Sequence, residues 1–294
     1  MNSVKIHLIL YTLIILFTTE RTVAQAKNIT DAYFEAAFSG NYVKAKQILT
    51  NLKKEYPYSQ KTYLITANYY GNAYEISGGN DKYYLVCKKY ADEAINSLIK
   101  KKDLNNEDVF RIISAKSILL KINVQKKNYL QVAENMQSVI RHFEYATKHE
   151  NDDDKMKFIS GMYNYYAETA KEDYPIIYPL LLFYPSGDKD KGLKLLKECT
   201  HSGDKNISIR SLLQLALIYY RDEKKITVAE NYFNALLKIY PNNLVWQTEY
   251  FKALKKYNKT KEYRIRQGII DRKIKENSLL TKEQKNYFIK KTEL

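Results

Sequence analysis

The most constraining feature of this sequence is a spacing of small and apolar residues that occurs near both ends of the chain. Ala45 is followed by apolar residues at helical intervals and, twelve positions later, by Pro57. Ala229 is followed by the same kind of series and, again twelve positions later, by Pro241. Intervals of three and four residues place the apolar side chains on one face of a helix, and each proline ends its helix. This spacing predicts a repeated helical unit.

Helical periodicity continues between and after these two units. Residues 77–80 (SGGN) form a typical break between two helices. The further helices that we expect cover residues 59–76, 82–100, 108–125, 129–148, 152–171, 189–200, 244–257, 260–275 and 281–290. Each of them has an apolar stripe too narrow for stability in water, so antiparallel pairs must stack on their neighbours in a linear file.

Residue by residue, the two units resemble the tetratricopeptide repeat. Gly40 and Tyr42 stand where that family opens its second helix, and Ala45 stands where the two helices cross. Ala32 and Tyr33 occupy the Leu-Gly site of the first helix, so that half departs from the family pattern. The resemblance implies an all-α fold: a right-handed α-solenoid of about six antiparallel helix pairs plus a C-terminal capping helix. It also implies that first helices line a concave face that binds a protein or peptide.

Composition agrees with helices rather than strands. Nine glycines and five prolines in 294 residues are few for an all-β protein, which needs frequent turn residues. A hydrophobic content of 45% is enough for a packed core. Many of the 28 tyrosines fall inside the expected helices. Tyrosine can fill the space between helices, and it can also line the concave face and stack on a ligand.

The N-terminal residues have the order of a secretory signal peptide. Lys5 precedes an apolar run over residues 8–17, and small residues follow around Ala24 and Ala26. We therefore expect residues 1–24 to be a signal peptide, cleaved after Ala24 or Ala26, and 25–294 to be the repeat domain. The alternative is a membrane anchor, although ten residues rise only about 15 Å of the roughly 30 Å that a bilayer core requires.

Export sets the expected compartment. The mature protein should be periplasmic or secreted, with no transmembrane segment after cleavage and no nucleic acid among its partners. An alternative is the lumen of the endoplasmic reticulum, because the chain ends in KTEL, one substitution from a retention signal.

Cys87 and Cys199 each fall at helical spacing within an apolar stripe, so we expect two buried thiols in separate helix pairs. The alternative is a disulfide.

Residues with catalytic potential are few. The expected mature chain has three histidines, none at the spacing of paired metal ligands, and no phosphate-binding loop or nucleophile motif. Cys199 and His201 are two positions apart and point in different directions on a helix. Asp152, Asp153 and Asp154 are expected to cap a helix N-terminus. We expect no metal, no cofactor and no enzyme activity; an enzyme built on this frame would need a deep pocket with converging carboxylates or histidines.

Two stretches suggest binding surfaces. The segment 175–188 is apolar and carries three prolines, so it forms either an extension that caps the middle of the solenoid or a loop that lines a groove. Residues 252–294 contain 14 Lys or Arg and 5 Asp or Glu, against a whole-chain net charge of +15. This basic end is either a solvated face or a site for an acidic ligand such as an envelope glycan or lipid. The candidate binding residues are Phe34, Asn68 and Tyr165 on first helices, with Lys252, Lys255, Lys256, Arg264 and Arg266 at the basic end.

Overall fold

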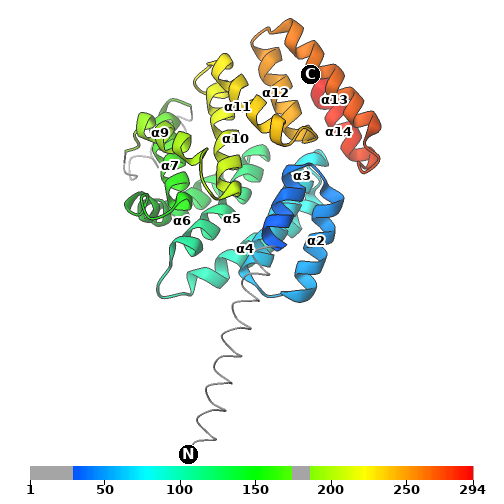
Figure 1. Cartoon of the computed structure of the whole chain (residues 1–294). Coiled ribbons are helices and arrows are strands. Elements are labelled where there is room, and N and C mark those ends of the chain that lie inside the picture. The colour runs from blue at the N-terminus through cyan, green and yellow to red at the C-terminus, as the bar shows by residue number, and fades with distance from the viewer. Residues whose placement is uncertain (1–28, 174–185, 294) are drawn as a thin grey trace, which may run out of the picture.

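The computed structural model describes residues 29–173 and 186–293, and the regular elements in these ranges are all α-helices (Figure 1). An N-terminal helix covers residues 29–38. The helices that follow are α2 (Tyr42–Glu55), α3 (Gln60–Ile76), α4 (Asp81–Ile99), α5 (Asn106–Gln125), α6 (Tyr129–Lys148), α7 (Asp154–Asp173), α9 (Lys189–Cys199), α10 (Lys205–Arg221), α11 (Ile226–Ile239), α12 (Leu244–Lys256), α13 (Thr260–Glu276) and α14 (Lys282–Glu293). Most of the apolar segment 175–188 lies outside the described residues.

The boundaries follow the periodicity of the sequence closely. The nine ranges expected beyond the two repeat units agree with the observed helices to within two residues at every end except the last, where α14 continues to Glu293. The helices are amphipathic, each with a buried stripe and an exposed face. Among the described residues, no helix combines the length and the apolar character needed to cross a membrane.

Short polar side chains determine where many of the helices begin. Ser59 Oγ accepts a hydrogen bond from the backbone N–H of Thr62 at 3.1 Å. Asn105 Oδ1 accepts from the backbone N–H of Asp108 at 2.9 Å, and the Asp108 carboxylate accepts in return from the N–H of Asn105. Asp153 Oδ1 accepts from the N–H of residue 156, which is the capping role expected for this acidic run. Each cap satisfies backbone donors that the helix leaves free, and its loss costs about 1 kcal/mol.

The helices pack in chain order as a solenoid of pairs, so the expected all-α solenoid is confirmed. The pairs are α3 with α4, α5 with α6, α7 with α9, α10 with α11 and α12 with α13. First helices also contact one another from pair to pair, α3 with α5, α5 with α7 and α7 with α10. Second helices have no comparable contacts with one another in the described ranges. The first helices therefore form the inner layer of the solenoid.

The repeat unit formed by α10 and α11 shows how one pair is held together. Ala229, Phe233 and Leu236 of α11 are fully buried, in one cluster with Leu215 and Ala216 of α10. Alanine adds only a methyl group to the backbone, so it permits a close approach of the two helices, while the larger residues fill the space beside it. The small residue and the later apolar residues of the repeat spacing thus have distinct packing roles.

The two ends of the solenoid meet, which the sequence did not lead us to expect. The ring of Phe38, at the end of the N-terminal helix, lies 5.9 Å from the ring of Tyr240 and 5.8 Å from that of Trp246. The Asn243 side-chain amide donates a hydrogen bond to the Phe38 carbonyl at 2.9 Å. The first unit of the chain is therefore packed against the units that contain α10, α11 and α12.

Further contacts complete this closure. Gly40 has a positive φ of 75°, and a Cβ there would lie 3.0 Å from the carbonyl oxygen of Asn242, so both the turn and the close approach favour glycine. Ile76 at the end of α3 belongs to one buried cluster with Phe251 of α12 and Phe288 of α14. In Figure 1 the blue first units accordingly lie beside the orange and red last helices. The helix pairs thus follow one another in chain order as expected, but the array curves until the apolar surfaces at its two ends pack against each other.

The two cysteines lie in separate helices, α4 and α9, as expected from their spacing. Both are free thiols with no exposed surface. Burial raises the pKa of Cys87 and of Cys199 to about 12, because a thiolate is poorly solvated in an apolar environment. Both are therefore protonated packing residues at neutral pH.

Substitutions on α11 test this packing. Leu236→Ala removes a fully buried side chain and should lower the free energy of unfolding by about 2–5 kcal/mol. The matched control is Ile239→Ala on the same helix; because Ile239 is 47% exposed, its truncation should cost well under half as much. Urea unfolding followed by circular dichroism measures both, and equal losses would contradict the assigned orientation of α11.

Candidate binding surface

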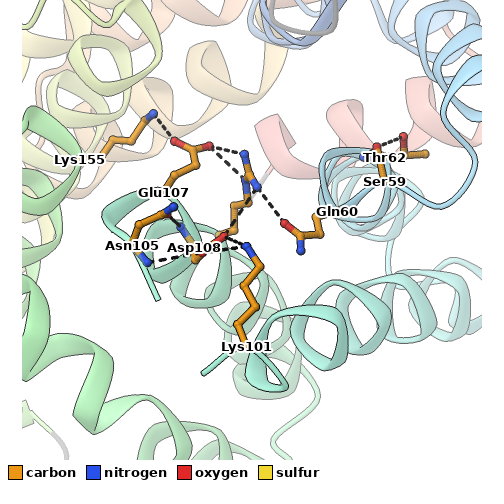
Figure 2. A network of polar contacts seen from close by, with 9 residues as sticks. Ser59, Gln60, Thr62, Lys101, Asn105, Glu107, Asp108 and Lys155 are labelled. Carbon is orange, nitrogen blue, oxygen red and sulfur yellow. Dashed lines mark hydrogen bonds and ion pairs between the residues drawn. The ribbon is translucent and has the colours of Figure 1, made fainter. Parts of the chain in front are cut away.

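The N-terminal turns of α3, α5 and α7 bring charged side chains together on the inner layer (Figure 2). Glu107 of α5 forms an ion pair with Arg111 at 2.9 Å and a second with Lys155 of α7. Arg111 also donates a hydrogen bond to the side-chain oxygen of Gln60 in α3 at 2.9 Å. One polar network therefore links three consecutive first helices.

A second carboxylate, that of Asp108, fixes the first turn of α5, where this network begins. The side chain of Asp108 is only 3% exposed, and both of its oxygens accept hydrogen bonds from Lys101 Nζ at 2.9 Å. Lys101 belongs to the turn between α4 and α5, so the contact ties that turn to the first turn of α5. A buried carboxylate is costly unless it is paired and hydrogen-bonded, and Asp108 is both.

Helix register aligns the charges of the network. Lys61, Glu107 and Lys155 each stand two positions after the residue that caps their helix. Equivalent positions on successive first helices lie side by side in a stack of repeats, so these three side chains form a line along the inner layer. No sequence motif singled these three residues out, although the spacing from Ser59, Asn105 and Asp153 was a usable signal.

Lys61 is the one member of this line without a partner of its own. Within the described residues it forms no ion pair and no side-chain hydrogen bond. Burial lowers its pKa most, and the cations Arg111 and Lys155 lower it further, while the carboxylates of Glu107 and Asp31 only partly offset these effects. The net charge around Lys61 is therefore positive, and a carboxylate from outside the chain would reduce the repulsion between these cations.

A cavity of about 470 Å³ lies where the N-terminal helix meets α10. Its lining residues are Asp31, Glu35, Phe38, Gly203, Asp204, Lys205, Asn206 and Tyr240. Glu35 accepts hydrogen bonds from Lys205 Nζ at 2.7 Å and from the Tyr240 hydroxyl at 2.8 Å. Burial alone would raise the pKa of Glu35, but these two donors outweigh it and hold the pKa below its usual value. The two hydrogen bonds of Glu35 thus join the N-terminal helix to α10 and to the end of α11, where the solenoid closes.

The three candidate residues from first helices are engaged in internal contacts. The guanidinium of Arg210 lies 5.3 Å from the ring centre of Phe34. Asn68 Oδ1 accepts a hydrogen bond from the Tyr33 hydroxyl at 3.0 Å. Tyr165 is fully buried and donates to a carboxylate of the turn after α10, and burial together with that bond raises its pKa. Their role in binding stays a prediction, and the structure gives each of them a packing role.

The five C-terminal cations do not share one face. Lys252 forms an ion pair within α12 at 2.7 Å, Arg266 donates to a glutamine of α12 at 2.7 Å, and Lys256 lies 5.3 Å from a tyrosine ring of α10. Lys255 is half-buried at the end of α12. Arg264 is exposed on the outer side of α13, since two positions turn a helix by about 200° from Arg266.

Groups with catalytic potential are dispersed. Among the described residues, no set of three His, Cys, Asp or Glu side chains is arranged to hold a metal ion. His149 is stacked on Tyr145 and contacts Asp152, and His201 contacts the neighbouring Thr200. The raised pKa of Cys199 is the opposite of what an activated nucleophile requires.

Comparison with known proteins agrees with this architecture. The sequence model of the tetratricopeptide repeat family matches residues 210–243, which cover most of α10, all of α11 and the closing proline. Searches of curated proteins and of solved structures gave no match. The match, together with helix pairs that stack in chain order, makes this a tetratricopeptide-like repeat protein.

The charged network predicts a pH-dependent stability. Burial alone would raise the pKa of Glu107, but Lys155 and Arg111 outweigh it and hold the pKa below its usual value. The ionised carboxylate therefore contributes stability above the unfolded-state pKa of about 4.3, and this contribution is lost as the pH falls through the lower folded-state value. Glu107→Gln should cost about 1 kcal/mol at pH 7 and progressively less below about pH 4.

Urea unfolding from pH 7 to pH 3 measures the difference between the two proteins. The control is Glu55→Gln, because Glu55 is exposed at the end of α2 and forms no ion pair within the described residues. A Glu107→Gln variant as stable as the parent at pH 7 would show that the ion pairs contribute nothing net.

Proposed function

We propose that the protein is a non-catalytic scaffold that binds an acidic segment of a protein or peptide partner along its inner layer. The partner would lie across the N-terminal turns of α3, α5 and α7. The observation that carries the proposal is the unpaired Lys61 beside Arg111 and Lys155. Tetratricopeptide-like repeats commonly serve as interaction scaffolds, which supports a protein as the partner.

The polar character of the inner layer supports recognition by charge. The network residues are held in place by ion pairs and hydrogen bonds, so little side-chain freedom would be lost on binding. Electrostatic attraction of this kind weakens with ionic strength, because the screening length falls from about 10 Å at 0.1 M salt to about 3 Å at 1 M.

We also propose that the scaffold works outside the cytoplasm, in the periplasm or as a secreted protein. The support is the order of a basic residue, an apolar run and small residues over positions 5–26. Cell fractionation and N-terminal sequencing of the native protein test this. A mature terminus at Gln25 or Lys27 would agree with it, and recovery of the uncleaved chain from the cytosol would refute it.

The binding proposal is tested by Lys61→Glu. Lys61 has no ion-pair partner in the described part of the chain, and the repulsion from Arg111 and Lys155 outweighs the attraction to Glu107 and Asp31. The substitution should therefore leave the unfolding free energy unchanged or slightly raised. It should also reduce capture of the partner from native extracts by about tenfold or more. Capture on the immobilised full-length protein at 0.1 M and 1 M salt, quantified by mass spectrometry, provides the measurement.

The control is Lys46→Glu, which makes the same charge change at an exposed position of α2. The control should capture the same proteins as the parent, and their recovery should fall at high salt. If the Lys61→Glu variant captured those proteins as well as the parent does, the inner layer would not be the binding surface.

A further inference from the structure

The outer face of α13 carries a row of exposed cations. These cations are Lys261, Arg264, Arg272 and Lys275, and Ile265 is exposed among them. The five residues are called the α13 face below. At 3.6 residues per turn they fall within an arc of about 100°, and at 1.5 Å per residue they extend over about 21 Å. The opposite side of the helix is buried through Ile270 and Ile274.

The four cations of the α13 face are unpaired in the part of the chain that the structure describes. Other basic residues in this region are paired, Lys252 with Glu249 at 2.7 Å and Lys259 with Glu230 at 3.9 Å. In the described residues, no ion pair or side-chain hydrogen bond involves a cation of the α13 face. Two exposed glutamates, Glu262 and Glu276, lie near the ends of the helix and Asp271 is half-buried on it, so the four exposed cations still outnumber the three acids.

Exposed aliphatic residues accompany these charges. Ile265 is 58% exposed between the cations, and Leu279, in the turn that follows α13, is 50% exposed. Two cavities in the described residues, one against the N-terminal helix and one between α5 and α6, contain no residue of α13. The exposed side of a single helix is convex, whereas tight protein interfaces depend on pockets that receive anchoring side chains.

We propose that the α13 face binds the surface of an anionic lipid bilayer. Unpaired, exposed cations suit a surface of many equivalent phosphate headgroups, which requires no matched geometry. Ile265 would enter the boundary between headgroups and acyl chains, as apolar residues of interfacial helices do. The α13 face is distinct from the inner layer, so it would place the scaffold at a membrane and leave Lys61 free for a partner.

The test is co-sedimentation of the full-length protein with two kinds of vesicle, pure phosphatidylcholine and phosphatidylcholine with 30% phosphatidylglycerol. The neutral vesicles measure any attachment that does not depend on charge. The expected result is stronger binding to the anionic vesicles at 0.1 M salt, with the excess lost at 1 M salt.

Two variants assign the excess to the α13 face. Arg264→Gln with Arg272→Gln should reduce anionic-vesicle binding at least tenfold, since each basic residue near such a surface contributes a factor of about five. The matched control, Lys46→Gln with Lys54→Gln, removes the same charge from exposed positions of α2 and should have a much smaller effect. Ile265→Ser should weaken binding to the same vesicles without changing its salt dependence.

Three results would overturn the proposal. The first is equal binding to neutral and anionic vesicles, and the second is equal loss in the α13 and control variants. The third is binding of soluble poly-L-glutamate in place of anionic vesicles, which would indicate an acidic polypeptide as the ligand of this face. Because none of these variants alters Lys61 or its neighbours, failure here leaves the proposed partner binding on the inner layer separately testable.

Discussion

Burial of apolar stripes between neighbouring helix pairs is the interaction on which the rest of the structure depends. The helices of the described ranges are each too narrow in their apolar stripe to be stable alone, so each pair requires the next one. In an open array the first and last pairs would each expose an apolar side. Here Phe38 packs against Tyr240 and Trp246, and Ile76 packs with Phe251 and Phe288, so each end covers the other.

This packing also determines the chemistry of the inner layer. Because the first helices start from equivalent caps, Lys61, Glu107 and Lys155 are brought into line across three pairs. Two of these residues neutralise each other within the network, and Lys61 is left as an unpaired cation. The same register that builds the core therefore leaves a charge available to a partner.

Much of the fold could be predicted from the sequence, but little of the site could. Periodicity located the helices because the same residues that form the stripes, such as Ala229 and Leu236, are those that the pairs bury. Closure could not be predicted, because it depends on the accumulated curvature of many pairs, and the sequence around Gly40 does not show that its close neighbour is Asn242. Candidate residues such as Asn68 were chosen only because they lie on the expected inner face of a helix. That criterion cannot show that the side-chain oxygen of Asn68 already accepts a hydrogen bond from Tyr33.

Closure has a consequence for how the molecule loses structure. An open array can fray from a terminal repeat, since that repeat has only one neighbour. In this chain the N-terminal helix lies between α2 on one side and α10 to α12 on the other, so opening it means breaking two interfaces. During synthesis on the ribosome, the first unit emerges long before residues 240–246. Its aromatic face therefore stays exposed until those residues have been made. Amide protons of the N-terminal helix should consequently exchange as slowly as those of the middle helices.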